Sequence, residues 1–344
     1  MQSLPLGGTG IQASRIALGA WAIGGWNWGP QDDEESVRSI QAAIDSGITL
    51  IDTAPVYGFG RSEEVVGRAI AGRRREEVVI ATKVGMRWDL DRGKLFFRSS
   101  EDEIDPQGKT AVHVYASPES VREEVERSLR RLQIEHIDLI QTHWQDETTP
   151  IADTMGELLR LKAEGKVRAI GVCNASPAQM DEYRAVGSLD SDQDRFSLID
   201  RQAEGEKLPY CLGHNLAFLA YSPLANGLLT GKMGPDRVFP KGDMRNVRPR
   251  FAVESRRMVT EALNQICPMA ESRGVSLAQL IIAWTLGQPG VTHVLVGART
   301  PEQARENAVA ASIALTDEER QRIAGIAGDL GDRVGSVAPT SSRK

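Results

Sequence analysis

The sequence predicts a single (β/α)8 barrel, and three observations support this fold class. Short runs rich in Val, Ile and Leu recur along the 344 residues, and each is followed by a turn and an amphipathic helical stretch, which is the pattern of βα units. Eight such units fit the length of one barrel domain. The first strand also lacks the glycine-rich fingerprint that an open nucleotide-binding sheet would place directly after it.

Seven strands are predicted from apolar runs, at residues 15–19, 49–53, 78–83, 137–142, 167–172, 217–221 and 293–296. The eighth must lie between the fifth and sixth of these, where the only candidate is the polar stretch around residues 191–198. Two β-prone segments flank a glycine-rich turn in LGGTGIQAS at residues 6–14. They predict an N-terminal β-hairpin that plugs the barrel floor.

Several helices have clear start and stop signals. Acidic residues open the helix predicted at 32–46, Ser117 caps one that begins at Pro118, and Thr300 caps one at 301–312. A helix at 151–164 stops at a glycine. Two additions interrupt the repeat: a long loop at 84–116, and two extra helices, 254–273 and 276–286, before the last strand. Extra helix is also expected at the C-terminus.

No linker divides the chain, so residues 1–330 are predicted to form one domain. Residues 331–344 are expected to be a flexible tail, with fraying from residue 328 onward because the segment is small and polar.

Composition excludes several classes of protein. The formal net charge is −6, and the basic cluster at 73–75 is followed at once by Glu76 and Glu77, so nucleic acid is not an expected partner. The three cysteines form no CxxC pair, which predicts reduced thiols, no metal site and a cytoplasmic location. No signal-peptide pattern or membrane-spanning apolar run is present. A monomer or weak oligomer away from membranes is expected.

Two glycine-rich motifs imitate phosphate-binding loops without meeting their requirements. GFGRSE at residues 58–63 follows a strand and opens a helix, but Glu63 replaces the third glycine of the dinucleotide fingerprint. GLLTGKM at residues 227–233 has its glycines one residue too close, and Met233 replaces the Ser or Thr that a P-loop uses for magnesium. Neither a Rossmann domain nor a P-loop is predicted.

Four polar residues fall at or just after the C-terminal ends of three neighbouring predicted strands, where barrel enzymes build their active sites. Asp52 ends the second strand and Tyr57 follows it, Lys83 ends the third, and His143 ends the fourth. Carbonyl reduction needs a proton at the oxygen as hydride reaches the carbon. Tyr57 is the candidate donor, although a phenol with a pKa of about 10 needs help at neutral pH.

The other three residues supply that help. Lys83 would lower the pKa of Tyr57, Asp52 would keep the ammonium in place and charged, and His143 would orient the carbonyl oxygen. Structural alternatives are open for Asp52, as a loop cap, and for Tyr57, as a packing residue of a turn. Lys83 is harder to explain structurally, because a lysine that ends an apolar strand must find a carboxylate or be costly to bury.

These residues resemble the aldo-keto reductase family. IDTAPVYGFGRSEEVVG, ATKVG and DLIQTHW match its motifs and place the family's Asp, Tyr, Lys and His, in order, at the four positions above. KVRAIGVCNASPAQM, LAYSPLANGLLTGK and VLVGARTPEQARENAVA extend the resemblance over nearly the whole chain. The chain is most similar to bacterial NADPH-dependent aldehyde reductases of the general-stress-protein type. The resemblance implies NADP(H) bound extended across the barrel mouth.

The resemblance also implies which residues bind that cofactor. Cys173, Asn174 and Gln193 would meet the carboxamide, with Cys173 where the family more often has Ser, and Tyr221 would stack on the nicotinamide ring. The full implied set is Ala20, Trp21, Asp52, Cys173, Asn174, Gln193, Tyr221, Ser222, Pro223, Leu224, Gly227, Leu228, Lys232, Gly297, Arg299, Gln303, Glu306 and Asn307.

Arg299 carries the expected preference for NADPH over NADH. Its guanidinium would pair with the 2′-phosphate and stack on adenine. Many relatives place a basic residue at Gly297 or Gln303, and this chain has none there, so Arg299 would act nearly alone.

The resemblance implies a substrate site formed by Trp21, Tyr57, His143 and Trp144. Trp26 and Trp28 lie on the loop after the first strand, either as further pocket wall or as loop packing. Three functions fit: a broad NADPH-dependent aldehyde reductase, a cofactor-sensing regulatory subunit like the channel-associated β subunits, and a dehydrogenase that oxidises aldoses. The first is preferred, since nothing in the chain resembles the extended N-terminal segment of the second.

Overall fold

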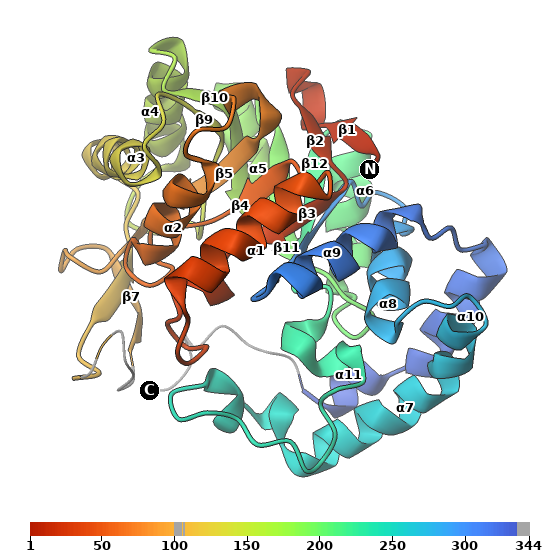
Figure 1. The fold of residues 1–344 in the computed structure, drawn as a ribbon. Coiled ribbons are helices and arrows are strands. Elements are labelled where there is room, and N and C mark those ends of the chain that lie inside the picture. The colour runs from red at the N-terminus through yellow and green to blue at the C-terminus, as the bar shows by residue number, and fades with distance from the viewer. Residues whose placement is uncertain (100–104, 106, 336–344) are drawn as a thin grey trace.

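The computed structural model describes residues 1–99, 105 and 107–335, and its centre is a closed barrel of eight parallel strands (Figure 1). In order around the barrel the strands are β10 (Val167–Cys173), β11 (Ser191–Arg195), β12 (Ala217–Tyr221), β13 (His293–Val296), β3 (Ile16–Gly19), β4 (Leu50–Asp52), β5 (Val79–Val84) and β9 (Ile137–Thr142). The predicted fold class is confirmed. Each of the seven predicted apolar runs coincides with a strand to within one residue at either end.

The polar eighth strand, β11, exists but is shorter than predicted, ending at Arg195 rather than at residue 198. It pairs in parallel with both neighbours, so that Asp192 lies opposite Val172 on one side and Phe218 on the other. Pairing at both edges satisfies its backbone groups. Backbone hydrogen bonds, rather than apolar side chains, therefore define this strand.

Helices cover the outside of the barrel and connect successive strands (Figure 1). They are α1 (Asp33–Asp45), α2 (Arg61–Ile70), α3 (Pro118–Leu132), α4 (Ile151–Ala163), α5 (Pro177–Val186), α6 (Lys207–Gly213), α7 (Val253–Glu271) and α8 (Leu277–Leu286), followed after the last strand by α9 (Pro301–Val309), α10 (Asp317–Ala327) and α11 (Leu330–Arg333). Both predicted caps are confirmed: the Ser117 and Thr300 side chains accept hydrogen bonds from the first turns of α3 and α9.

The N-terminal hairpin closes one end of the barrel, as predicted. Its strands β1 (Ser3–Pro5) and β2 (Gln12–Ser14) are antiparallel and lie near the label N in Figure 1. Leu6 and Ile11 from its turn are buried in one apolar cluster with the barrel-interior residues Ala17, Leu50 and Leu219. This cluster fills the floor, so the polar strand ends gather at the opposite end.

The segment at 84–116 is not the irregular loop that was expected. It contains a three-stranded antiparallel sheet of β6 (Met86–Arg87), β8 (Ala111–Val114) and β7 (Lys94–Arg98), which projects beside the barrel (Figure 1). KLFFR has too little alternation to predict a strand, and cross-strand pairing decides its conformation. Part of the segment, residues 100–104 and 106, lies outside the described residues.

The C-terminal region is more ordered than predicted, as far as it is described. The segment from residue 328 onward was expected to fray, but it contains helix α11. Leu330 in this helix and Val334, directly after the helix, are both buried. The Arg250 guanidinium donates to the Gly335 carbonyl at 2.8 Å. Burial of two apolar side chains overrides the small, polar composition. Residues 336–344 lie outside the described part, and the division at residue 330 stays a prediction.

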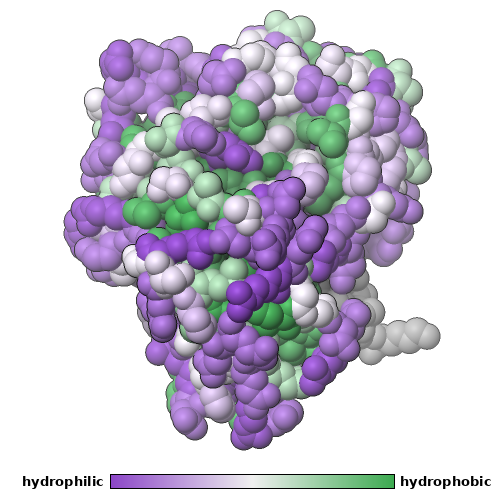
Figure 2. Space-filling view, turned by 90° about the vertical axis from the view of Figure 1, so that its right-hand side faces the viewer, coloured by the Kyte–Doolittle hydropathy of each residue, from purple (hydrophilic) through white to green (hydrophobic). Residues whose placement is uncertain are grey.

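Most of the face shown in Figure 2 is hydrophilic, with hydrophobic residues in several separate areas. Among the described residues, the most exposed large apolar side chains are Val238, at 82%, and Val247, at 80%, both in the segment between β12 and α7. Single exposed apolar side chains are common on folded proteins.

Every helix in residues 1–99, 105 and 107–335 is too short or too polar to cross a lipid bilayer.

Candidate active site

The structure brings the four predicted polar residues together at the open end of the barrel. Asp52 and Lys83 come from the neighbouring strands β4 and β5, and His143 follows β9, the next strand around. The Lys83 ammonium is 1% exposed and donates to Asp52 Oδ2 at 2.7 Å and to the Thr53 carbonyl at 2.8 Å. The carboxylate that a buried Lys83 requires is therefore Asp52.

Tyr57 completes this group. Lys83 Nζ lies 5.0 Å from the centre of the Tyr57 ring, and the His143 ring is edge-on to it at 5.8 Å. A close backbone contact holds the Tyr57 loop: Gly58 has φ +67°, and a Cβ there would lie 2.2 Å from the Gly24 carbonyl oxygen. Glycine is needed for both the dihedral angle and the contact.

Burial and charge set the protonation states of this group. Burial raises the pKa of Tyr57 to about 12, and the Lys83 ammonium opposes that rise. Lys83 thus lowers the pKa of Tyr57, as predicted. The prediction that this pKa falls below its usual value is wrong, because desolvation of the phenol raises it by more. Burial alone would lower the pKa of Lys83, but Asp52 and its other neighbours hold it above its usual value. Burial and Lys83 lower the pKa of His143 well below its usual value, which makes the imidazole neutral.

The second oxygen of Asp52 also has partners. Gln193 Nε2 donates to Asp52 Oδ1 at 2.7 Å, and Gln141 Nε2 points to the same oxygen at 3.4 Å. Gln193 was predicted at the site, whereas Gln141 was not. Its one sequence signal is an amide inside the apolar run IDLIQT.

Two more of the predicted carboxamide residues lie beside this group. Asn174, which has φ +56°, donates from Nδ2 to the His143 carbonyl at 3.1 Å. Tyr221 donates its hydroxyl to Asn174 Oδ1 at 2.9 Å. Cys173 is 1% exposed, and burial raises the pKa of its thiol well above the usual value. The side chain is therefore a neutral thiol, which is a weak hydrogen-bond donor.

The loop after β12 has the backbone shape of an anion site. Ser222, Ala225, Asn226 and Gly227 all have φ between +46° and +92°, and the last three are consecutive. Turns that include left-handed residues direct backbone N–H groups into a concave nest that suits phosphate oxygens. The predicted residues Pro223, Leu224 and Leu228 belong to the same turn, and Lys232 is exposed just beyond it. This donor set fits a dinucleotide pyrophosphate.

Arg299 lies at the neighbouring strand end and reaches across to the loop after β3. It donates from Nε to Gln31 Oε1 at 2.9 Å and from Nη2 to the Pro30 carbonyl at 3.0 Å. Burial and nearby Arg245 lower the pKa of Arg299. Arg245, paired with Asp243 at 2.6 Å, was not predicted. Two guanidinium groups therefore lie close enough to interact at this end of the site.

The remaining predicted residues of α9 stabilise the turn that carries Arg299. Gln303 Oε1 accepts from the Arg299 backbone N–H at 2.8 Å, and Asn307 Nδ2 donates to the Gly297 carbonyl at 3.2 Å. The Glu306 carboxylate instead accepts from the Ser276 hydroxyl that caps α8. The structure therefore directs Glu306 towards a helix cap.

Aromatic rings flank Tyr57 on two sides. The ring centres of Trp21 and Tyr57 are 6.2 Å apart, and the Trp28 ring packs edge-on against Trp21 with a centre-to-centre distance of 5.2 Å. On the other side Trp144, which follows His143, packs on Phe96 of β7 at 4.9 Å. The sheet inserted after β5 thus adds to this aromatic wall a ring that the sequence did not predict.

The two tryptophans whose roles were left open differ. Trp26 is 3% exposed, stacks on Phe97 at 5.1 Å and packs on Phe59 at 4.7 Å. It is a packing residue of the loop. Trp28 is partly exposed beside Trp21 and lies at the mouth.

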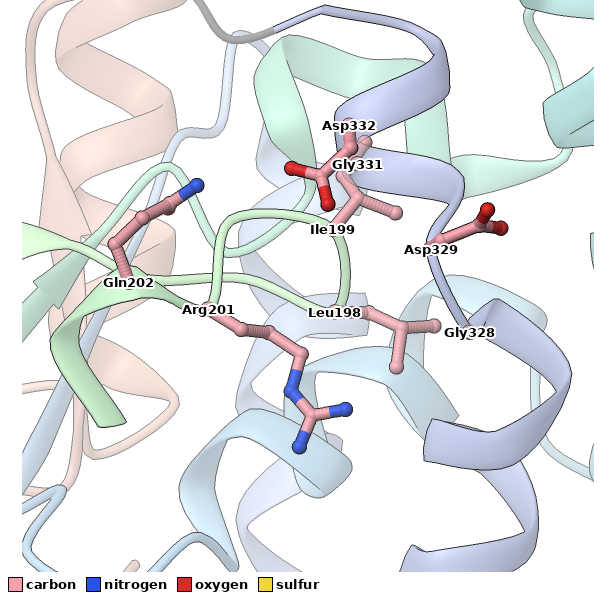
Figure 3. Close-up of a pocket in the computed structure, with 8 residues that line it drawn as sticks. All are labelled: Leu198, Ile199, Arg201, Gln202, Gly328, Asp329, Gly331 and Asp332. Carbon is pink, nitrogen blue, oxygen red and sulfur yellow. The ribbon is translucent and has the colours of Figure 1, made fainter. Parts of the chain in front are cut away.

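A separate cavity of about 190 Å³ lies between the loop after β11 and the α11 region (Figure 3). Its lining includes Arg201, which is already paired with Glu204 at 2.7 Å. It contains none of the predicted site residues. Within the described residues, no group of three or more His, Cys, Asp or Glu side chains is arranged to hold a metal ion.

The barrel is closed and parallel, and at its mouth a buried Lys–Asp pair lies beside Tyr57 and His143. A phosphate-type loop follows β12. This arrangement is that of a barrel oxidoreductase. The aldo/keto reductase family model matches residues 15–327. The chain belongs to the aldo/keto reductase family.

Similar proteins agree with this assignment. Aldo-keto reductase YhdN of Bacillus subtilis is 41% identical over 94% of this chain and 92% of its own length. The NADH-specific methylglyoxal reductase of Escherichia coli is 42% identical over 93% of this chain and 96% of its own length. The structure of glycerol dehydrogenase AKR11B4 from Gluconobacter oxydans matches with a TM-score of 0.83 and 42% identity, over 99% of both chains.

Proposed function

We propose that this protein reduces small aldehydes or ketones to alcohols with NADPH, with Tyr57 as the proton donor. The observation that carries the proposal is the ammonium of Lys83, 1% exposed, paired with Asp52 and 5.0 Å from the Tyr57 ring. A buried ion pair of this kind is a poor source of stability. It is well suited to stabilising negative charge on a phenol that gives up its proton.

Each residue then has a defined task. The bound cofactor supplies a hydride to the carbonyl carbon. Tyr57 donates its proton to the carbonyl oxygen, and Lys83, kept charged by Asp52, stabilises the resulting phenolate. The neutral His143 donates an N–H to the same oxygen and orients the substrate. Since the pKa of Tyr57 is about 12 without cofactor, the phenol holds its proton at neutral pH.

NADPH is the proposed cofactor because of Arg299, although the Escherichia coli relative is NADH-specific. Arg299 is partly buried at the strand end next to the phosphate-type loop, and Arg245 adds positive charge nearby. We also propose a cytoplasmic location, which fits three cysteines that form no disulfide. The enzyme is proposed to be a monomer or weak oligomer.

The reverse reaction is the second candidate. The similarity to a glycerol dehydrogenase favours oxidation of a small alcohol. Tyr57 would then accept a proton, so the raised pKa of its phenol favours this direction at high pH. A regulatory subunit that only senses cofactor would show no steady turnover with any aldehyde.

Replacing Tyr57 by Phe tests the reaction. We expect Tyr57→Phe to lower kcat for aldehyde reduction by about 10²- to 10⁴-fold, because the proton donor is lost while the ring still packs. NADPH consumption with a panel of aldehydes measures this. Tyr210→Phe, the same change on α6, is the control and should leave kcat unchanged. Equal turnover by wild type and Tyr57→Phe would overturn the mechanism.

Replacing Arg299 by Ala tests the cofactor. We expect Arg299→Ala to weaken NADPH binding about tenfold or more while changing NADH binding little, because only NADPH carries the 2′-phosphate. Fluorescence titration with each cofactor gives the ratio of dissociation constants. Arg305→Ala, at an exposed position on α9, serves as the control. An unchanged ratio would remove Arg299 from the phosphate site.

A further inference from the structure

Asp52 is held by two amides as well as by Lys83. Its Oδ2 accepts from Lys83 at 2.7 Å, while its Oδ1 accepts from Gln193 Nε2 at 2.7 Å and faces Gln141 Nε2 at 3.4 Å. Gln193 Nε2 also donates to Gln141 Oε1 at 3.3 Å. Asp52, Gln141 and Gln193 are each 3% exposed or less. The three side chains therefore form one buried network.

The chemistry of the network determines how both amides point. An ionised carboxylate only accepts hydrogen bonds, so each amide must turn its NH2 group towards Asp52. The two hydrogens of Gln193 are then directed to Asp52 and Gln141. Its Oε1 remains for a ligand, and a carboxamide N–H of the cofactor fits that acceptor.

Gln141 lies between the floor and the mouth of the barrel. Successive side chains of a strand alternate between its two faces, so residues 139 and 141 share one face of β9, and His143, directly after the strand, continues the alternation. Leu139 belongs to the barrel-interior cluster, and His143 lies at the mouth beside Tyr57. A buried amide at an interior position is costly unless it is hydrogen-bonded. The partners of Gln141 are Asp52 and Gln193.

We propose that Gln141 is a positioning residue for the reaction. Together with Gln193 it holds Asp52 Oδ1, so that Oδ2 stays on Lys83 and Lys83 stays against Tyr57. The network joins β4, β9 and β11, none of which is adjacent to another around the barrel, so it orients Asp52 from across the interior. Through Gln193 it also connects the cofactor carboxamide to Asp52. This inference rests on the proposed function.

A double-mutant cycle with Asp52 tests the proposal. We expect Gln141→Met to lower the single-turnover rate of carbonyl reduction about tenfold, with the substrate KM unchanged, because Gln141 does not face the substrate. Asp52→Asn removes the charge through which Gln141 acts. In that background, Gln141→Met should therefore lower the single-turnover rate less than about twofold. Thr142→Val, a buried change on the opposite face of β9, is the control and should have little effect in either background.

Two binding and stability measurements accompany the rates. The dissociation constant of the cofactor, from tryptophan fluorescence, should stay unchanged in Gln141→Met and rise in Gln193→Met. Melting temperatures identify variants that merely unfold. If Gln141→Met does not fold, Gln141→Leu in the same two backgrounds supplies the cycle, and a smaller loss in Asp52→Asn supports the network.

Equal losses in both backgrounds, or no loss in wild type, would overturn the positioning role. That failure is distinct from failure of the proposed function, in which Tyr57→Phe would turn over as fast as wild type. An inactive Tyr57→Phe together with additive effects of Gln141 would leave the reaction intact and remove Gln141 from it.

Discussion

Asp52 and Asp192 are both buried carboxyl groups, but their surroundings differ. Asp52 has Lys83 on one oxygen and amides on the other. Asp192, 0% exposed on β11, has no side-chain hydrogen-bond partner within the described residues, and the backbone of Ala175 lies near its carboxyl group. Burial raises the pKa of Asp192 to about 7, although Lys207 opposes the shift. Asp192 therefore takes up a proton on folding near neutral pH.

This uptake makes stability depend on pH. The pKa of Asp192 is about 7 in the folded state and near 3.8 when unfolded, so its contribution is complete below pH 4 and is lost as the pH rises through 7. Between pH 5 and pH 8, we expect wild type to lose about 1–3 kcal/mol of unfolding free energy relative to Asp192→Asn. Urea unfolding at the two pH values measures this. Asp181→Asn, an exposed change, should follow wild type, and parallel pH curves for wild type and Asp192→Asn would contradict the prediction.

At the scale of elements, the sheet β6–β8–β7 is the main departure from the regular barrel. It carries Phe96, which packs on Trp144 at 4.9 Å, next to His143. Trp144, Phe96 and Tyr57 all pack against one small core that is separate from the main one. The sheet therefore supplies one side of the wall around the candidate substrate site.

Phe96 should affect substrate size selection more than the chemical step. We expect Phe96→Ala to raise KM about tenfold for an aromatic aldehyde such as benzaldehyde, because the substrate ring loses apolar contact area with Phe96. The KM for methylglyoxal should change little. Steady-state kinetics with both substrates measures the effect. Leu95→Ala, at a 43% exposed neighbouring position, is the control. A parallel loss for both substrates would exclude a role in selection.

The predictability of elements follows their local signals. The apolar strands were found to within one residue because burial on both faces of a parallel strand requires a continuous apolar run. β11 was found only as the missing eighth strand, because its side chains are polar and its pairing is not visible in the sequence. The strands of the inserted sheet were missed because they are short, KLFFR does not alternate, and their antiparallel pairing is not visible in the sequence.

At the scale of the molecule, the apolar floor and the candidate active site occupy opposite ends of the barrel. Leu6 and Ile11 of the hairpin complete the interior cluster at the floor, whereas Lys83, Tyr57 and His143 lie at the mouth. This division is typical of (β/α)8 barrels. It predicts that damage to the floor changes stability without changing the reaction.

Truncating Leu6, which is 0% exposed, tests this division. We expect Leu6→Ala to lower the unfolding free energy by about 2–5 kcal/mol, through lost burial and a cavity, and to leave kcat unchanged below the melting transition. Urea unfolding and kinetics on the same sample measure both. Leu212→Ala, at a 67% exposed position, should change stability by less than about 0.5 kcal/mol. A large fall in kcat for folded Leu6→Ala would mean that floor and mouth are coupled.

Local patterns in the chain were sufficient for the barrel, its caps and the residues at the strand ends, because periodicity, capping and strand order are properties of neighbouring residues. The grouping of Asp52, Tyr57, Lys83 and His143 also followed, since adjacent parallel strands end at one mouth. Contacts across the barrel did not follow. Gln141 meets Asp52 from 89 positions away, and burial reverses the expected pKa shift of Tyr57. Desolvation and long-range hydrogen bonds depend on the whole packed interior, so only the folded structure decides them.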